Sequence, residues 1–265
     1  MNPNTILALV SRYVLLYTRN PVRLVELFFW PIVQLLVWGF VTSYLQSQGS
    51  GSFPKVITFL IGGIILWDTL FRSQQGVAIS FLEDVWTRNL LNIFAAPVRM
   101  SEYLAATFVV GFLRVLVTTV VMALIAWLGY SFNLLQFNLP LVFFYANLMI
   151  FGWSLGVLVT ALILRYGHGV ESLAWAIPFM IQPVAAVFYP VSALPGWLQP
   201  IAHALPPSYV FEGMRHFLAH GDIVWSQMFL ALGLNALYLT IAGAVFAHTL
   251  RVAKQRGLLV KVSSS

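Results

Sequence analysis

Long apolar stretches with hardly a charge are the feature of this chain that most constrains its fold. There are six, at about 22–44, 53–79, 104–128, 140–164, 172–187 and 225–249. Helices of about 20 residues cross a bilayer core of about 30 Å, whereas the short alternating segments of barrel strands are not visible. Charged residues make up 8% of the chain, against about 25% in soluble domains. We therefore predict an all-α membrane protein with six transmembrane helices, in which residues 1–265 form a single transmembrane domain.

The first residues predict a helix that lies on the membrane instead of crossing it. Over 4–19, apolar and aromatic side chains such as Val10, Tyr13 and Tyr17 recur on one helical face, which is typical of an interfacial helix. Pro21, preceded by an asparagine, would end this helix before the first span begins.

Lysine and arginine residues indicate the orientation of the spans. In a six-helix topology, eleven of the 14 face one side, Lys55 and Arg215 face the other, and Arg114 lies within the third span. Cytoplasmic loops carry such an excess of positive charge. We therefore expect both termini in the cytoplasm, and we attribute the net charge of +6 to membrane topology and not to nucleic-acid binding.

The longest interruption of apolar sequence in the first half is a cytoplasmic segment at 81–103. It brings Glu83, Asp84, Trp86 and Arg88 together and ends its first part at Ala-Ala-Pro. This pattern predicts a short amphipathic helix outside the bilayer. Acidic, aromatic and basic groups together would make a docking surface, although an ordinary solvated loop would carry similar charges.

A proline-rich region interrupts the chain between the fifth and sixth spans. Its prolines are Pro178, Pro183, Pro190, Pro195, Pro200, Pro206 and Pro207. A continuous span cannot hold so many, because each removes a backbone donor and clashes with the preceding turn. We predict that the fifth span ends near Pro190 and that 190–221 forms an external re-entrant helical hairpin that acts as a gate. An irregular external loop is the alternative.

Ionisable residues near the end of the proline-rich region and within the third span suggest chemistry. Glu212 and Arg215 are spaced to pair on a helix and to fix the hairpin. Glu212, His216 and His220 share a helical face that could bind a metal. We expect no metal there, because nothing in the sequence supplies a supporting partner and polar residues facing water explain the pattern. Arg114 is deep enough to contact an anionic substrate on a translocation path; pairing inside the bundle or snorkelling are equal alternatives.

In this order, the motifs resemble those of the bacterial type-2 ABC exporter permeases. The first is the Arg88-Asn-Leu-Leu segment running through Ala-Ala-Pro to Glu-Tyr. The second is FYPVSALPGWLQPIAHALPPSYVFEGMR, which ends at Arg215, and the third is the basic ending RVAKQRG. The resemblance covers essentially the whole chain.

That resemblance implies a subunit of an exporter in the bacterial inner membrane. Such permeases form homodimers, contact membrane lipids and bind two copies of a cytoplasmic ABC ATPase, with the segment after the second span as the coupling helix. The substrate would be a lipid-linked glycan, a lipid or an amphipathic drug. This chain contains no G-x-x-x-x-G-K-[ST] sequence, so ATP and Mg²⁺ would bind the partner, and we expect no cofactor, catalytic residue or enzyme activity in this chain.

Two other classes of protein remain as alternatives. An ion-coupled secondary transporter would need acidic residues within the membrane, and the spans offer little beyond Asp68. It would also show inverted repeats, which are not visible. An intramembrane enzyme would need a convergent polar set, and only the face with Glu212, His216 and His220 comes near.

Overall fold

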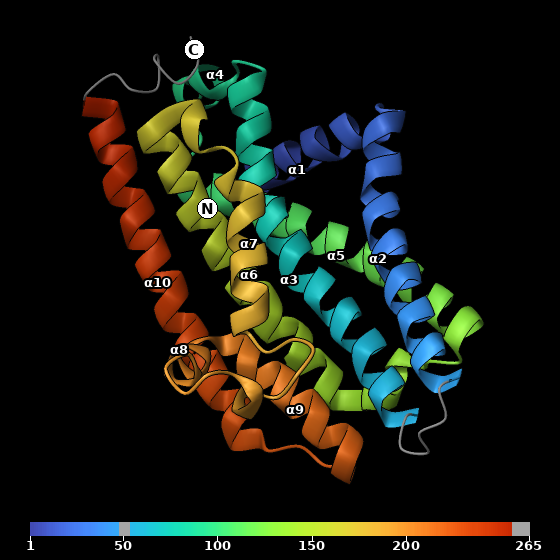
Figure 1. The fold of residues 1–265 in the computed structure, drawn as a ribbon. Coiled ribbons are helices and arrows are strands. Elements are labelled where there is room, and N and C mark those ends of the chain that lie inside the picture. Colours follow the sequence, from blue (N-terminus) through green and yellow to red (C-terminus); the bar gives the residue numbers. More distant parts are fainter. Residues whose placement is uncertain (48–53, 256–265) are drawn as a thin grey trace.

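The computed structural model describes residues 1–47 and 54–255, and all regular secondary structure within these ranges is helical (Figure 1). The helices are α1 (Pro3–Thr18), α2 (Pro21–Ser47), α3 (Pro54–Trp86), α4 (Leu90–Ala95), α5 (Met100–Tyr130), α6 (Asn138–Tyr166), α7 (Leu173–Val184), α8 (Gln199–Ala204), α9 (Pro206–His220) and α10 (Trp225–Gln255). Three 3₁₀ turns, η1 (Leu134–Phe137), η2 (Gly167–Val170) and η3 (Val191–Ala193), lie between them.

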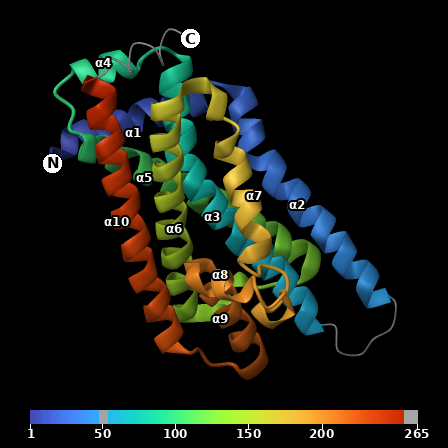
Figure 2. The same cartoon turned by 60° about the vertical axis from the view of Figure 1, so that its left-hand side comes forward.

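Helix α3 is the centre of the bundle and packs between α5 and α6, while α10 covers another side of α6 (Figure 2). Glycines permit these close crossings. Gly76 of α3 lies directly against the backbone of Gly111 in α5, and Gly152 and Gly156 of α6 lie against the backbone of α3. Small residues at helix crossings let two backbones approach closely, which is how membrane helices gain van der Waals contact.

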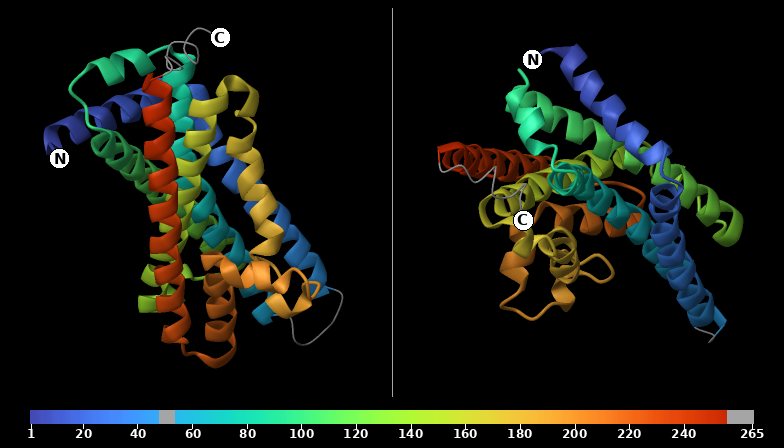
Figure 3. Two further views of the ribbon diagram at one scale, coloured as in Figure 1. Left: turned by 90° about the vertical axis from the view of Figure 1, so that its left-hand side faces the viewer. Right: turned by 90° about the horizontal axis from the view of Figure 1, so that it is seen from above.

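The two ends of the bundle differ in character. Helix α1, helix α4 and the last turns of α10 lie at one end, whereas α8 and α9 lie at the other (Figures 1 and 2). Seen from above, α1 lies across the end of the bundle and alongside α5 (Figure 3). Leu9, Val10 and Tyr13 of α1 are buried against Ala106 and Val110 of α5, so the predicted helix at 4–19 has its apolar face on the protein.

Within residues 1–47 and 54–255, four segments are long and apolar enough to span a membrane: Pro21–Tyr44, Met100–Tyr130, Leu134–Tyr166 and Trp225–Gln255. The expected fifth span is shorter than predicted, because α7 has 12 residues and extends about 18 Å at 1.5 Å per residue. Helix α3 is long, but it carries buried Asp68 and Arg72 in its middle. Helical membrane architecture is therefore established, while the count of six spans and the re-entrant hairpin stay predictions.

Candidate functional site

A cluster of buried charges joins α1, α2, α3 and α5 near the end of the bundle that carries α4. Arg12 Nη2 of α1 lies 2.6 Å from Asp84 Oδ1, and Arg23 Nη1 of α2 lies 2.9 Å from Glu83 Oε1. Both carboxylates belong to the last turn of α3 and are almost fully buried. We call Arg12, Arg23, Glu83, Asp84 and Arg114 the charge cluster.

Tyrosine hydroxyls complete the coordination of these carboxylates. Tyr13 of α1 and Tyr103 of α5 both donate hydrogen bonds to Asp84 Oδ2. Tyr17 hydrogen-bonds to Glu83, and burial raises the pKa of Tyr17 to about 12, so this phenol keeps its proton at neutral pH. Asp84 therefore connects three helices, since its partners come from α1 and α5 and its own backbone from α3.

Arg114 is the arginine of the cluster that forms no ion pair with any described residue. Its guanidinium lies over the ring of Tyr17, 4.2 Å from the ring centroid, and Nη1 lies 3.5 Å from the carbonyl oxygen of Gln75. The side chain is 7% exposed, and its Nε and Nη2 have no hydrogen-bond partner among the described residues. Such buried donors are costly unless a further acceptor reaches them.

A cavity of about 130 Å³ lies beside the cluster. Its lining includes Arg23, Arg72, Arg114, Glu26, Glu83, Trp86 and Trp175. Three guanidinium groups therefore face two carboxylates, and two indole rings flank them. A small anionic group with an apolar extension matches this lining, because arginine binds oxyanions through paired N–H groups.

At the opposite end, Glu212 and Arg215 of α9 hold the chain that follows α7. The pairing expected between them is present, with Arg215 Nη2 and Glu212 Oε1 3.1 Å apart. Glu212 Oε1 also accepts a hydrogen bond of 2.6 Å from the N–H of Val191. Arg215 donates to the carbonyl oxygen of Ala186 at 3.0 Å. Ala186 has a φ of 54°, so the pair fastens a left-handed turn that an alanine rarely adopts.

Pro190, Pro195 and Pro206 lie at breaks between helices, whereas Pro178 and Pro183 lie inside α7. Pro190 has extended backbone and precedes η3. The carbonyl oxygen of Pro195 accepts hydrogen bonds from the N–H groups of Leu198 and Gln199, where α8 begins. Pro206 is the first residue of α9. Proline is well tolerated at the first position of a helix, because the N–H group that it lacks would have no partner within the helix there. Glu212 and Arg215 therefore fasten the chain on either side of residues 187–190, and the gating role of the residues named for the external gate stays a prediction.

Comparisons with known proteins show which family has this sequence pattern. Residues 4–219 match the ABC-2 type transporter family. This chain belongs to that family. It is 24% identical over 205 residues to the inner membrane transport permease YadH of Escherichia coli strain K12, covering 73% of this chain and 76% of the relative. It is also 27% identical over 168 residues to ABC transporter G family member 20 of Dictyostelium discoideum, covering 63% of this chain but only 23% of that relative.

The structure corrects the expected docking surface of this ABC-2 type chain. Glu83 and Asp84 do not face outward: their side chains are buried, because α3 continues to Trp86 and both carboxylates turn toward arginines from α1 and α2. Trp86 is half-exposed, with its indole N–H 3.1 Å from Glu171 Oε1, and Arg88 is exposed. Of the four residues, only these two lie on the surface.

The exposed part of the 81–103 segment is α4 and the turns around it. A short helix is present in this segment, but it contains none of the four residues on which the prediction rested, since it covers only Leu90–Ala95. It ends where Ala96 takes up extended backbone before Pro97, as the residue before a proline commonly does. Asn92, Ala95 and the Ala-Ala-Pro turn are exposed. Helix α4 lies at the extreme end of the bundle, directly after α3 (Figure 1).

Proposed function

We propose that this chain is the membrane-spanning subunit of an ATP-driven exporter of the bacterial inner membrane. It works as a homodimer with two copies of a cytoplasmic ABC ATPase and has both termini in the cytoplasm. It moves a lipid-linked glycan, a lipid or an amphipathic drug outward. The observation that carries this proposal is α4, an exposed helix that follows directly on the central helix of an ABC-2 type chain.

The charge cluster supports a route by which force on α4 reaches the rest of the protein. Helix α3 runs without interruption from Pro54 to Trp86, and three residues separate it from α4. At its last turn, Asp84 and Glu83 fasten α1 and α2 through Arg12 and Arg23. A displacement of α4 therefore moves α3 together with these helices, because buried ion pairs resist separation.

Co-purification with an ATPase tests the coupling role. We expect the tagged chain to retain an ATPase from detergent-solubilised host membranes, and the variant Arg88→Glu with Ala95→Arg to lose at least tenfold of that ATPase activity. Both positions are exposed, so the change alters a docking surface and leaves the interior intact. Glu83 and Asp84 are unsuitable for this test, because reversing buried charges would unfold the end of α3.

The matched control is Arg251→Glu with Gln255→Arg. It makes the same change of net charge at exposed positions of α10, at the same end of the molecule. We expect this variant to retain the ATPase. If both variants retained the ATPase equally, α4 would not be part of the interface with the ATPase. If no sample contained an ATPase, a self-sufficient transporter would be favoured.

Arg114 carries the second part of the proposal, which is that the 130 Å³ cavity receives the anionic group of the substrate. In nanodiscs holding the complex, we expect phosphatidylglycerol to stimulate ATP hydrolysis more than phosphatidylcholine does. Arg114→Gln should raise the fraction of phosphatidylglycerol needed for half-maximal stimulation roughly tenfold, since a hydrogen bond to a charged group contributes about 1.5–3 kcal/mol. Exposed Arg165, changed to Gln, should not alter it. An unchanged response in Arg114→Gln would leave Arg114 a packing role only.

A further inference from the structure

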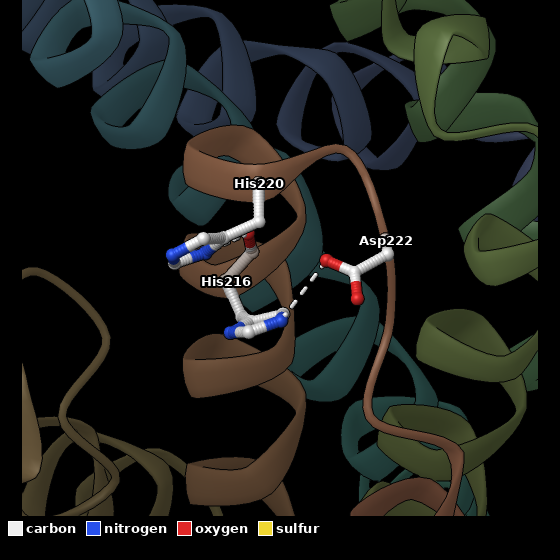
Figure 4. Close-up of side chains that lie close together, drawn as sticks. All are labelled: His216, His220 and Asp222. Carbon is white, nitrogen blue, oxygen red and sulfur yellow. Dashed lines mark hydrogen bonds and ion pairs between the residues drawn. The ribbon is translucent and has the colours of Figure 1, made fainter.

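Three side chains that can bind metals lie close together at the end of α9 (Figure 4), far from α4 (Figure 1). Gly221 ends the helix with a φ of 83°, and this left-handed turn brings Asp222 back beside the last turn. His216 Nε2 lies 3.1 Å from Asp222 Oδ1, and the rings of His216 and His220 are stacked with centroids 4.4 Å apart. One donor atom from each residue lies within 4.8 Å of the other two.

These distances are close to those of a bound transition-metal ion. In a tetrahedral zinc site, ligand atoms at about 2.0–2.2 Å from the metal are roughly 3.4 Å from one another. The contact between His216 and Asp222 already meets that spacing, and the remaining donors need to approach by about 1.5 Å at most. His220 and Asp222 are exposed, so rotation of their side chains supplies this movement without disturbing the core.

The backbone also provides support for one ligand. His220 Nδ1 lies 3.2 Å from the carbonyl oxygen of His216. A proton donated from Nδ1 to a backbone oxygen leaves the lone pair of Nε2 free to bind an ion once the side chain has rotated. The sequence pattern alone offered no such supporting partner.

The structure also changes the set of ligands. Glu212, which shares the helical face with His216 and His220, is already engaged by Arg215 and by the N–H of Val191. Asp222 takes its place as the carboxylate, although it lies beyond the helix. Two imidazoles and one carboxylate with open positions form a site that suits zinc and related divalent ions, and not the all-oxygen site that magnesium prefers.

We propose that His216, His220 and Asp222 bind a divalent transition-metal ion, with Zn²⁺ as the best match and water completing its coordination. The bound ion links the last turn of α9 to the segment that leads into α10, so it restrains the unit fastened by Glu212 and Arg215. The site is independent of the proposed export function, because it rests on the geometry of these three residues alone.

Isothermal titration of the full chain in detergent with ZnCl₂ tests this site. The protein carries a tag without histidine and is first treated with a chelator. We expect one Zn²⁺ per chain, and at least a tenfold loss of affinity in His216→Gln with His220→Gln. Mg²⁺ should not bind, and Co²⁺ should produce the visible absorption of a tetrahedral complex that disappears in the same variant.

The matched control removes two other histidines, His203→Gln with His248→Gln, and should bind Zn²⁺ as the unchanged chain does. Size-exclusion chromatography confirms that each variant is folded. An absence of saturable binding would overturn the proposal, and so would equal affinity in the two double variants. Since neither measurement uses ATP or an ATPase, the result does not depend on whether the export proposal holds.

Discussion

Replacement of Asp84 by leucine is expected to release α1 from the bundle. The change removes the acceptor shared by Arg12, Tyr13 and Tyr103. Removing one partner of a buried ion pair costs about 3–5 kcal/mol, and two buried hydroxyls lose their acceptor as well. A loss of this size is a large fraction of the stability of a whole domain.

The chain has no cysteine, so a single introduced cysteine reports on α1 without background. Leu9→Cys places the thiol at the buried contact with α5, where a maleimide should react slowly. Adding Asp84→Leu should speed the reaction by at least tenfold. Asp222→Leu, at a carboxylate that is 71% exposed, should not. Slow labelling in both would mean that apolar packing alone holds α1.

Replacement of Gly152 by valine is expected to prevent α3 and α6 from packing. A Cβ atom at this position would overlap Ser73 Oγ and lie 2.6 Å from the carbonyl oxygen of Leu70. The carbonyl belongs to the backbone of α3 and cannot rotate away, so the helices must separate. Overpacking a core costs about 1–3 kcal/mol or more, and this contact lies at the centre of the bundle. We expect the folded peak in size-exclusion chromatography to be lost to aggregates.

Gly243 of α10 provides the control, because a Cβ atom at this position would have no neighbouring atom within 4 Å. Gly243→Val changes the same residue types within a helix and should leave the folded peak and the melting temperature nearly unchanged. Gly156→Val should resemble Gly152→Val, since its Cβ would lie 2.8 Å from the carbonyl oxygen of Gln74. Normal folding of Gly152→Val would show that the crossing is looser than described.

The sequence predicts an interruption at 81–103, but α3 continues to Trp86, and the charges of Glu83 and Asp84 lie inside the protein and not on its surface. Glu83 and Asp84 were expected on a docking surface, as charges usually lie in water. Their partners Arg12 and Arg23 are 60 or more residues away in the sequence, and no local pattern pairs them. Tyr13 had been recognised as part of the apolar face of the first helix. That it also donates to Asp84 depends on how α1 meets α3.

The glycines also show that local sequence patterns do not reveal which distant segments come into contact. The Gly62-Gly63 doublet is the pair that stands out in the sequence, and it lies near Met214 and Val187. The tighter crossings are at Gly76, Gly152 and Gly156. Spacing cannot rank these glycines, because each one acts only through the element that lies opposite.

By itself, the sequence determined the helical membrane architecture, the family, the break before Pro21, the helix break before Pro97 and the pairing of Glu212 with Arg215. These follow from local chemistry: the length and apolarity of segments, the missing donor of proline, and spacings within one helix. Only the tertiary structure decided that Asp84 is buried between three helices, that Arg114 lines a cavity, and that Asp222 joins His216 and His220. Each of these depends on which distant segments pack together, and packing arises from the summed burial and close contact of whole helices.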